Sequence, residues 1–392
     1  MPISKIKIFL LISIIFIFIS LIVVVVYLFK SPLITPIPSS PASFPSPTAK
    51  QFLSTKIAYK KNSSLYLMEE NGKIKMIANN IGSFRFSAKK QYLGYIQNVS
   101  VDGDNYGQSI LAYDLADEKT VSLLEQTLPI LKKTQPATSN RKWHDRSDAD
   151  ILFDFDFAAY DGKKITYARS DGVWLKDIAS QKTKHLLPNH YGAHPSGVED
   201  KLYTDLFWQS AGNYLLARLS FSESSKLQLY SLDDKKLIIL PDALAYDTIG
   251  FINAHGNKIF YSQAGPVGNN VGLWIDTKKI IDQSIVSAAS SSQGQIAAII
   301  EPDTFNENKK TILPFKTRGL YLVDLKGNLT PLLENEKIFS VSWSPDGNYL
   351  FFLENLTDQR NEAEDNQSIL MMLTVDGKNK KEVINGLYSY TL

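Results

Sequence analysis

Two histidines, His190 and His194, lie in the segment HYGAHPSGVED, close to Glu199 and Asp200. Neutral imidazoles and carboxylates together could bind zinc or another transition metal. Two histidines in an irregular segment are, however, more often part of an ordinary surface. The chain has no cysteine, which excludes disulfides and thiolate metal sites. The sequence therefore predicts no metal site and no cofactor, and these two histidines are the candidates if a metal is bound.

Two aspartates, Asp154 and Asp156, alternate with Phe153, Phe155 and Phe157. Successive side chains of a strand point to opposite faces, so the two carboxyl groups share one face. Carboxyl groups that share a face could line a channel and act as acid and base. They could also accept hydrogen bonds from neighbouring backbone. We expect this second role, because no chemical partner is visible nearby in the sequence.

A third group of residues suits contacts with another protein. The segment RKWHDRSDAD, residues 141–150, mixes an aromatic side chain with both signs of charge. Tryptophan and arginine are enriched at interface hot spots. A solvated loop with one tucked tryptophan is the alternative. The candidates for contacts with a protein or peptide partner are Arg141, Trp143, His144, Tyr191, Phe305 and Arg318.

Motifs of the common enzyme classes are absent. The chain has no G-x-S-x-G, H-E-x-x-H, G-x-x-x-x-G-K-[ST] or G-x-G-x-x-G. Its 42 basic and 40 acidic residues give a net charge of +2, which provides no drive toward nucleic acid. We therefore expect neither an enzyme nor a nucleic-acid-binding protein, although a catalytic site built from dispersed residues is compatible with the sequence.

The elements that must position these residues are short strands in a repeated pattern. The stretch WSPDGNYLFF, residues 343–352, contains a strand, a tight turn at Pro345-Asp346-Gly347 and a second strand. Similar stretches without gaps begin at Phe86, Ala158, Trp208, Ile252 and Ser290. Each copy is followed by a strand, a polar turn and a strand rich in Leu, Ile, Val and Tyr. Four-stranded units that recur about every 50 residues are typical of a β-propeller.

Counting the strands predicts how the ring closes. The first unit, residues 56–78, contains three strands, and the chain ends with a single strand in GLYSYTL, residues 386–392. The final strand can complete the first unit and remove its open edge. The predicted fold is therefore all-β: a seven-bladed propeller over residues 54–392, closed by a C-terminal strand in the first blade.

The stretch SPDGNYLFF, residues 344–352, resembles the SPDG-type repeat of TolB-like propellers, a WD-like repeat that also forms the propellers of the prolyl oligopeptidase group. Other copies replace Asp-Gly, for example with Ala211-Gly212, His255-Gly256 and Lys89-Lys90. The resemblance covers most of the chain at the level of the fold, and it implies a binding scaffold outside the cytoplasm. It implies no particular partner, because one fold hosts many functions.

Connection lengths distinguish the two faces of the predicted ring. If the strands of a blade are called A to D from the axis outward, the A–B and C–D turns are tight and share one face, here called the turn face. The B–C and D–A connections share the opposite face, here called the loop face. All the long connections belong to the loop face: 98–108, 125–149, 188–201, 262–271, 301–318 and 354–367. Long loops on a rigid scaffold commonly carry recognition, whereas tolerated insertions without use are the alternative.

The N-terminal residues predict a membrane anchor. Residues 8–29 contain no charge and span roughly 33 Å as a helix at about 1.5 Å per residue, enough for a hydrocarbon core of about 30 Å. No cleavage site follows the run. Lys5 and Lys7 precede it and Lys30 follows, which favours a cytoplasmic N-terminus at residues 1–7. Residues 30–53, rich in proline and serine, predict a stalk. The expected location is the cell membrane, with a single pass and the propeller outside the cytoplasm.

These features predict a membrane-tethered scaffold of the cell envelope that binds a protein or peptide through the loop face. Two alternatives stay open. One is an envelope glycan- or peptide-processing enzyme that uses Asp154 and Asp156. The other is a purely structural component of the envelope.

Overall fold

A computed structural model describes residues 55–102, 105–129, 152–158, 162–169, 171–188, 201–209, 212–221, 224–240, 245–252, 258–264, 271–302, 312–356 and 368–392. The chain divides into two compact units, Met1–Phe52 and Leu53–Leu392. The predicted N-terminus 1–7, membrane segment 8–29 and stalk 30–53 lie outside the described residues. Within the described ranges, no helix is long and apolar enough to cross a membrane.

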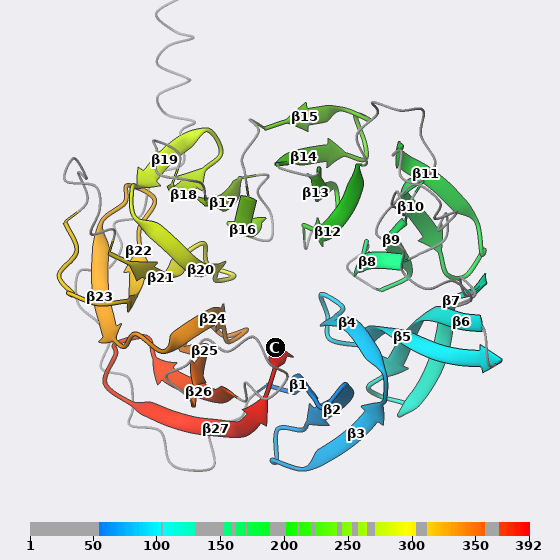
Figure 1. Cartoon of the computed structure of the whole chain (residues 1–392), viewed down its shortest axis with the longest axis horizontal. Helices are drawn as coiled ribbons and strands as arrows, with labels where there is room; N and C mark the ends of the chain where they lie inside the picture. Colours follow the sequence, from blue (N-terminus) through cyan, green and yellow to red (C-terminus); the bar gives the residue numbers. More distant parts are fainter. Residues whose placement is uncertain are drawn as a thin grey trace, which may run out of the picture. The chain divides into compact units, whose positions relative to one another are not determined.

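The described part of the second unit forms a ring of seven four-stranded antiparallel sheets (Figure 1). This confirms the predicted all-β seven-bladed propeller. From the axis outward, blade 1 contains β28 (Ser389–Thr391), β1 (Ile57–Lys61), β2 (Ser64–Met68) and β3 (Ile74–Ala78). Blade 2 contains β4 (Ile81–Phe86), β5 (Tyr92–Asp102), β6 (Asn105–Asp114) and β7 (Lys119–Pro129). Blade 3 contains β8 (Leu152–Phe157), β9 (Lys164–Arg169), β10 (Gly172–Asp177) and β11 (Thr183–Pro188).

The remaining four blades follow the same order of strands. Blade 4 contains β12 (Leu202–Trp208), β13 (Tyr214–Ser220), β14 (Ser225–Ser231) and β15 (Leu237–Ile239). Blade 5 contains β16 (Ala245–Phe251), β17 (Ile259–Ala264), β18 (Gly272–Ile275) and β19 (Lys278–Ile281). Blade 6 contains β20 (Ser284–Ser290), β21 (Ile296–Glu301), β22 (Gly319–Val323) and β23 (Leu329–Glu334). Blade 7 contains β24 (Ile338–Trp343), β25 (Tyr349–Asn355), β26 (Ser368–Thr374) and β27 (Lys380–Leu387).

The ring closes through the C-terminal strand, as the strand count predicts. Strand β28 pairs with β1 in blade 1, with Tyr390 opposite Tyr59. The Tyr390 hydroxyl lies 2.8 Å from the carbonyl oxygens of Ser340 and Phe351 in blade 7, and it accepts a hydrogen bond of 2.8 Å from Ser342 Oγ. A single phenol group therefore joins the last strand of the chain to both blades at the closure.

The repeated turn is formed as the sequence predicts. Gly347 has φ of 72°, and its N–H donates to the Ser344 carbonyl at 2.9 Å. The Asp346 carboxylate accepts from Ser344 Oγ at 2.5 Å and from the Asn348 N–H at 3.1 Å. In blade 2, where the motif has lost its glycine, Lys90 adopts the same left-handed conformation with φ of 52°. The turn geometry is thus kept where the Asp-Gly pair is lost.

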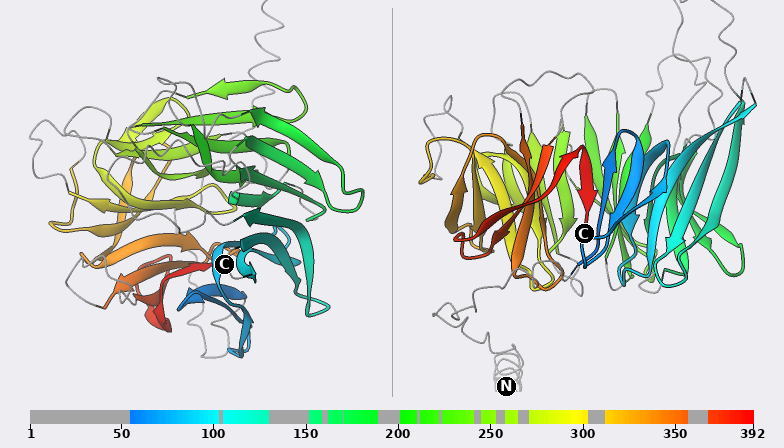
Figure 2. Two further views of the ribbon diagram at one scale, coloured as in Figure 1. Left: turned by 45° about the vertical axis from the view of Figure 1, so that its right-hand side comes forward. Right: turned by 90° about the horizontal axis from the view of Figure 1, so that it is seen from below.

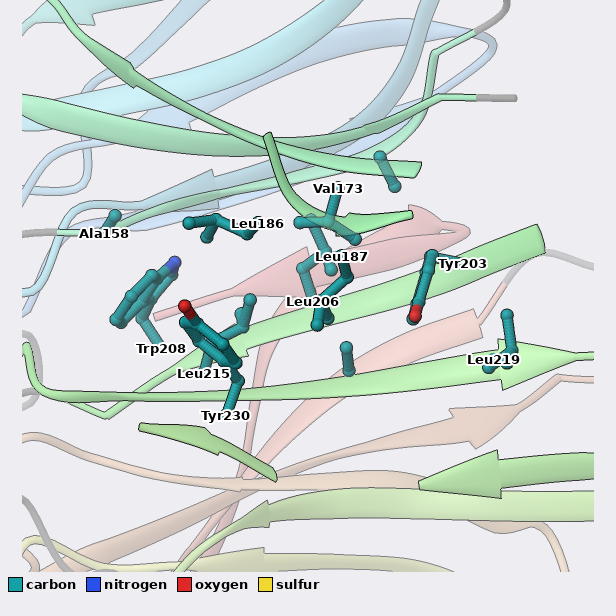
Figure 3. Packing of buried hydrophobic residues seen from close by; sticks show 12 residues of the cluster. Ala158, Val173, Leu186, Leu187, Tyr203, Leu206, Trp208, Leu215, Leu219 and Tyr230 are labelled. Carbon is teal, nitrogen blue, oxygen red and sulfur yellow. The ribbon is translucent and has the colours of Figure 1, made fainter. Parts of the chain in front are cut away.

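Apolar side chains from neighbouring blades pack against one another, because one blade cannot cover its own two faces. Figure 3 shows the cluster between blades 3 and 4, in which Val173, Leu186 and Leu187 lie opposite Leu206 and other side chains of blade 4. The indole of Trp343, which opens the SPDG-type stretch, packs against blade 6 and donates from Nε1 to the Ala289 carbonyl at 3.0 Å. Packing of blade on blade therefore buries apolar surface and stabilises the ring.

The inner strands also hold one another through a repeated polar contact. In six blades, the register between strands A and B shifts at a bulge. Near this bulge, a polar side chain accepts a hydrogen bond from a backbone N–H of the next inner strand. The described cases are Asp154 with Leu206 at 2.9 Å, Thr248 with Ala288 at 3.3 Å and Ser287 with Val341 at 3.0 Å. The carboxylate in blade 3 thus stands where blades 5 and 6 use a hydroxyl.

Blade 2 differs from the expectation for its B–C connection. The sequence predicts a long loop over residues 98–108, but residues 98–102 and 105–108 lie in β5 and β6, which remain paired from Asn98 opposite Gln108 to Asp102 opposite Asn105. Strand β7 likewise extends from Lys119 to Pro129. Figure 2 shows these three strands projecting beyond the other blades on the loop face. The dipeptide Asp102-Gly103 is typical of a tight hairpin turn, but the polar composition of the segment favours the interpretation as a loop.

A glycine at the contact between blades 2 and 3 allows a direct test of this packing. A Cβ atom at Gly94 would lie 2.6 Å from the ring of Phe155 and 2.8 Å from that of Phe157. We expect Gly94→Ala to lower the free energy of unfolding by about 1–3 kcal/mol, as overpacking of a buried contact does. Gly82→Ala is the control, because its Cβ would meet nothing closer than 3.8 Å. Denaturant titration of both variants checks the prediction, and equal stability of the two would contradict it.

Candidate functional site

Most of the residues predicted to contact a partner or metal belong to segments outside the described ranges. Outside the described residues lie the metal candidates His190 and His194 and the partner candidates Arg141, Trp143, His144, Tyr191 and Phe305. Within the described residues, no group of three or more His, Cys, Asp or Glu side chains could hold a metal ion.

Arg318 is the one predicted contact residue that the structure places. Its guanidinium bonds to Glu301 at 3.1 Å and to the Ile338 carbonyl at 3.2 Å, and the side chain is 13% exposed. It therefore ties the B–C connection of blade 6 to the first strand of blade 7. This geometry allows it to position the loop face, and its role in partner contact stays a prediction.

Asp154 and Asp156 lie on one face of β8, as the alternation predicts, and both accept backbone hydrogen bonds from β12. Asp154 Oδ2 accepts from the Leu206 N–H at 2.9 Å, and Asp156 Oδ2 accepts from the Trp208 N–H at 2.7 Å. Asp156 Oδ1 also accepts from the N–H of Phe157 at 2.8 Å. Of the two roles considered for these carboxylates, the structure gives them the backbone-binding one.

Arg85 supplies the positive charge that these two aspartates require. From β4 in blade 2, its Nη2 donates to both oxygens of Asp154 at 2.8 and 3.0 Å, and its Nη1 lies 3.6 Å from Asp156. Nη1 also donates to the Leu206 carbonyl of blade 4 at 2.7 Å. One guanidinium thus joins three blades at their inner strands. Sequence reasoning missed it, because Arg85 and Asp154 are far apart in the chain.

The Arg85 guanidinium lies against aromatic rings as well as carboxylates. Its Cζ is 5.6 Å from the ring centres of both Phe155 and Phe207. The Nε of Arg85 and the hydroxyl of Ser83, two residues earlier on β4, are buried without a hydrogen-bond partner. The guanidinium is therefore held by aromatic rings on its faces and by carboxylates at its edge. Its hydrogen bonds are made within the protein.

Burial dominates the electrostatics of this cluster. It raises the pKa of Asp154 from its ordinary value of 3.8 to about 6, against the opposing effect of Arg85. Burial raises the pKa of Asp156 in the same way. The nearby charge of Asp205 also raises the pKa of Asp154. Burying such carboxyl groups close together is unfavourable, and the paired guanidinium and the backbone N–H groups of β12 offset this cost.

The raised pKa of Asp154 predicts how stability depends on pH. A carboxyl whose pKa is higher in the folded state stabilises the fold below its unfolded pKa, and this contribution is lost as the pH rises through the folded pKa. Relative to Asp154→Asn, the free energy of unfolding of the wild type should therefore fall by about 2 kcal/mol between pH 4 and pH 7. Denaturant titrations of both proteins at several pH values measure this difference. A constant or increasing difference would contradict the shift.

A second polar cluster lies nearer the loop face, where β12 begins and β13 ends. Arg218 pairs with Asp205, and its Nε donates to Thr204 Oγ1 at 3.2 Å. The hydroxyls of Thr204 and Ser220 lie 2.9 Å apart. All four side chains are half-buried. The inner part of blade 4 therefore presents hydroxyl and charged groups close to the loop face.

A third cluster occupies the loop face of blade 3. Asp171, in the short B–C turn, receives two hydrogen bonds from Arg169 at 2.7 and 2.6 Å and one from Trp174 Nε1 at 2.9 Å. The Trp174 ring stacks on the His185 ring, with 4.5 Å between the ring centres. The guanidinium carbon Cζ of Arg169 lies 4.6 Å from the centre of the Trp174 ring. Partial burial raises the pKa of Asp171. The hydrogen bonds from Arg169 and Trp174 lower it by more than burial raises it, so the pKa is below its ordinary value.

This Arg169–Trp174–His185 cluster has the composition of an interface hot spot. Sequence reasoning missed this cluster, because only a structure brings residues 169, 174 and 185 together across three strands; the prediction for residues 141–150 lies outside the described residues. Cross-strand pairing sets Trp174 opposite both Tyr167 and His185. The cluster is therefore the described feature of the loop face best suited to contact another molecule.

Comparisons with known proteins identify the fold and no closer relationship. No family model matches the chain, and no curated protein sequence does. Among solved structures, an oligogalacturonate lyase from Vibrio parahaemolyticus has a TM-score of 0.52 at 11% identity, over 84% of this chain and 79% of that one. TolB from Acinetobacter baumannii has a TM-score of 0.45 at 13% identity, over 86% of this chain and 66% of TolB. The β-propeller domain of the Trilobed protease from Pyrococcus furiosus has a TM-score of 0.48 at 13% identity, over 84% of this chain and 93% of that domain.

At these identities the likeness concerns the fold alone. The resemblance to TolB-like propellers that the SPDG-type stretch indicates is confirmed at that level, since the described residues form a seven-bladed propeller. The neighbours include TolB, a lyase and a protease domain by name, so they do not select an activity for this chain.

Proposed function

We propose that this protein is a binding module that holds a protein or peptide partner on the loop face of its propeller. The observation that carries the proposal is the difference between the two faces. Every connection on the turn face is short, whereas the strands flanking residues 130–151, 189–201, 302–318 and 356–367 all end on the loop face. The projecting strands of blade 2 and the Arg169–Trp174–His185 cluster belong to that same face.

The proposal includes a tether. Thr55, the first described residue, lies on the turn face beside the A–B turn of blade 2, with its hydroxyl 2.5 Å from Lys90 Nζ. The loop face is therefore on the opposite side of the ring from Thr55. If residues 8–29 anchor the chain in the cell membrane and residues 30–53 form a stalk, the propeller holds its loop face available outside the cytoplasm.

A binding role accounts better for the described acids than an enzymatic one. Asp154 and Asp156, the candidates for a catalytic pair, are committed to two backbone N–H groups and to Arg85. A general base must reach the proton that it abstracts. We therefore propose that the protein is not an enzyme and that these acids stabilise the contact between blades 3 and 4.

Capture experiments test the proposal. The full chain, kept in mild non-ionic detergent and immobilised, serves as bait for an envelope extract, beside a variant in which residues 131–149 and 190–199 are shortened. A control bait carries Lys89→Glu and Lys326→Glu on the turn face. We expect a partner that is retained by the wild type and the control and lost with the shortened loops. Equal capture by all three baits would contradict a loop-face site, and capture by none would favour a purely structural role.

A further inference from the structure

The outer strand of blade 4 is apolar and exposed. Strand β15, Leu237–Ile239, pairs with β14 on one side, and its other edge is the rim of the ring (Figure 1). Leu237, Ile238 and Ile239 are 38%, 43% and 59% exposed. Three consecutive exposed apolar residues on a free strand edge are a strong template for pairing with another strand.

The other six outer strands of the described structure all carry a feature that discourages such pairing. Charged residues and proline at an edge have this effect in natural sheets. The residues concerned are Lys75 in β3, Lys119 in β7, Lys184 in β11, Lys278 and Lys279 in β19, Pro331 in β23, and Lys380 and Lys381 in β27. Strand β15 has no charged residue and no proline. The contrast indicates that this edge, unlike the others, is covered in the working protein.

The backbone of β15 is oriented for pairing. The Ser231 N–H donates to the Lys236 carbonyl at 2.9 Å, and the Leu240 N–H donates to the Leu227 carbonyl at 2.9 Å. Residues 236 and 240 therefore bond inward, toward β14. Alternation along the strand then directs the N–H and C=O groups of Leu237 and Ile239 outward, where an added strand can bond to them.

We propose that β15 pairs with β15 of a second copy of this chain, antiparallel and about a two-fold axis at Ile238. In this register Leu237 faces Ile239 of the second copy. The N–H of each residue donates to the C=O of the other, so each such pair makes two hydrogen bonds. Two four-stranded blades would become one eight-stranded sheet. A two-fold interface requires a surface that complements itself, and an apolar three-residue strand does so.

Charge also favours a second copy. The turn before β15 carries Asp233, Asp234, Lys235 and Lys236, two acids and two bases, so two copies meet without net repulsion. A strongly acidic or basic foreign segment would gain nothing there. Three side chains per copy fall far below the roughly 800 Å² per partner of a standard interface, so the pairing is weak and is best detected by trapping.

The absence of cysteine from the sequence makes trapping specific. Ile238 faces its own equivalent in a pair that is not hydrogen-bonded, where Cα atoms are about 4.5 Å apart, within the range for a disulfide. The full chain with Ile238→Cys, in mild detergent under gentle oxidation, should form a disulfide-linked dimer at least about ten times faster than Val121→Cys. Val121 is the matched control, an exposed apolar residue on the outer strand of blade 2.

A second variant separates pairing from chance collision. Adding Ile239→Lys to Ile238→Cys places a charge in the proposed pair and should reduce dimer formation to the rate of Val121→Cys, with tryptophan fluorescence confirming that the fold is kept. Dimer formation by Ile238→Cys no faster than the control, or unaffected by Ile239→Lys, would overturn the proposal. So would cross-linking in whole cells to another protein in place of a second copy.

Discussion

Removal of Ser389 to Leu392 is expected to destroy the cooperative unfolding of the propeller. The deletion takes away β28, leaves the inner edge of β1 without its three paired residues, and removes the phenol of Tyr390 from its contacts with blade 7. Each lost hydrogen bond contributes about 1 kcal/mol, and the half-buried ring of Tyr390 contributes packing as well. We expect a loss of at least about 5 kcal/mol, measured as the midpoint and steepness of thermal unfolding by tryptophan fluorescence.

Two smaller changes calibrate this result. Tyr390→Phe keeps the strand and the ring but removes the hydroxyl, so that Ser342 Oγ and two carbonyl groups lose a partner, and we expect a loss of about 1–3 kcal/mol. Removal of Leu392 alone, which follows β28, should leave the transition close to that of the wild type. If the deletion of the whole strand unfolds as cooperatively as the wild type, the closure does not hold the ring.

Arg85→Met is expected to be the most destabilising single change at the inner strands. It leaves Asp154 and Asp156 buried without their cation and leaves the Leu206 carbonyl without its donor. Breaking a buried ion pair by removing one partner costs about 3–5 kcal/mol, because the remaining charge is uncompensated. Denaturant titration at pH 7.5, where Asp154 is ionised, measures the loss.

A double-mutant cycle distinguishes charge from packing at this position. Adding Asp154→Asn to Arg85→Met removes the stranded charge and should recover at least about 1 kcal/mol of the loss. The exposed pair of Lys75 and Glu118 is the comparison, since Glu118→Gln should leave the stability close to that of the wild type. Strict additivity of the two inner substitutions would show that the charges do not interact.

The architecture could be predicted from sequence because it depends on short-range patterns. The Pro345-Asp346-Gly347 turn, the alternating strands, the three-stranded first unit and the single final strand are local features, and together they specify seven blades and the closure. Even the shared face of Asp154 and Asp156 follows from alternation. The extension of β5 and β6 was missed because polar residues there resemble a loop, although pairing with β7 makes them strands.

The contacts at the inner strands could not be predicted, because their partners are brought together only by closure of the ring. Arg85 meets an aspartate from the next blade and a carbonyl from the blade beyond it. Nothing near Arg85 in the sequence distinguishes it from the other basic residues. Asp154 and Ser287 both accept a hydrogen bond from the next inner strand, but the sequence alone does not show that a carboxylate and a hydroxyl share this role.

Site-specific cross-linking from the two faces is the most direct test of the account. A photo-reactive amino acid is placed in the full chain, in cells, at Lys201 or Lys316 on the loop face, and at Lys89 or Lys326 on the turn face. The account predicts adducts with the same partner protein from both loop-face positions and none from the turn face. Adducts from the turn face alone, or from both faces equally, would contradict the proposal that the loop face is the binding surface.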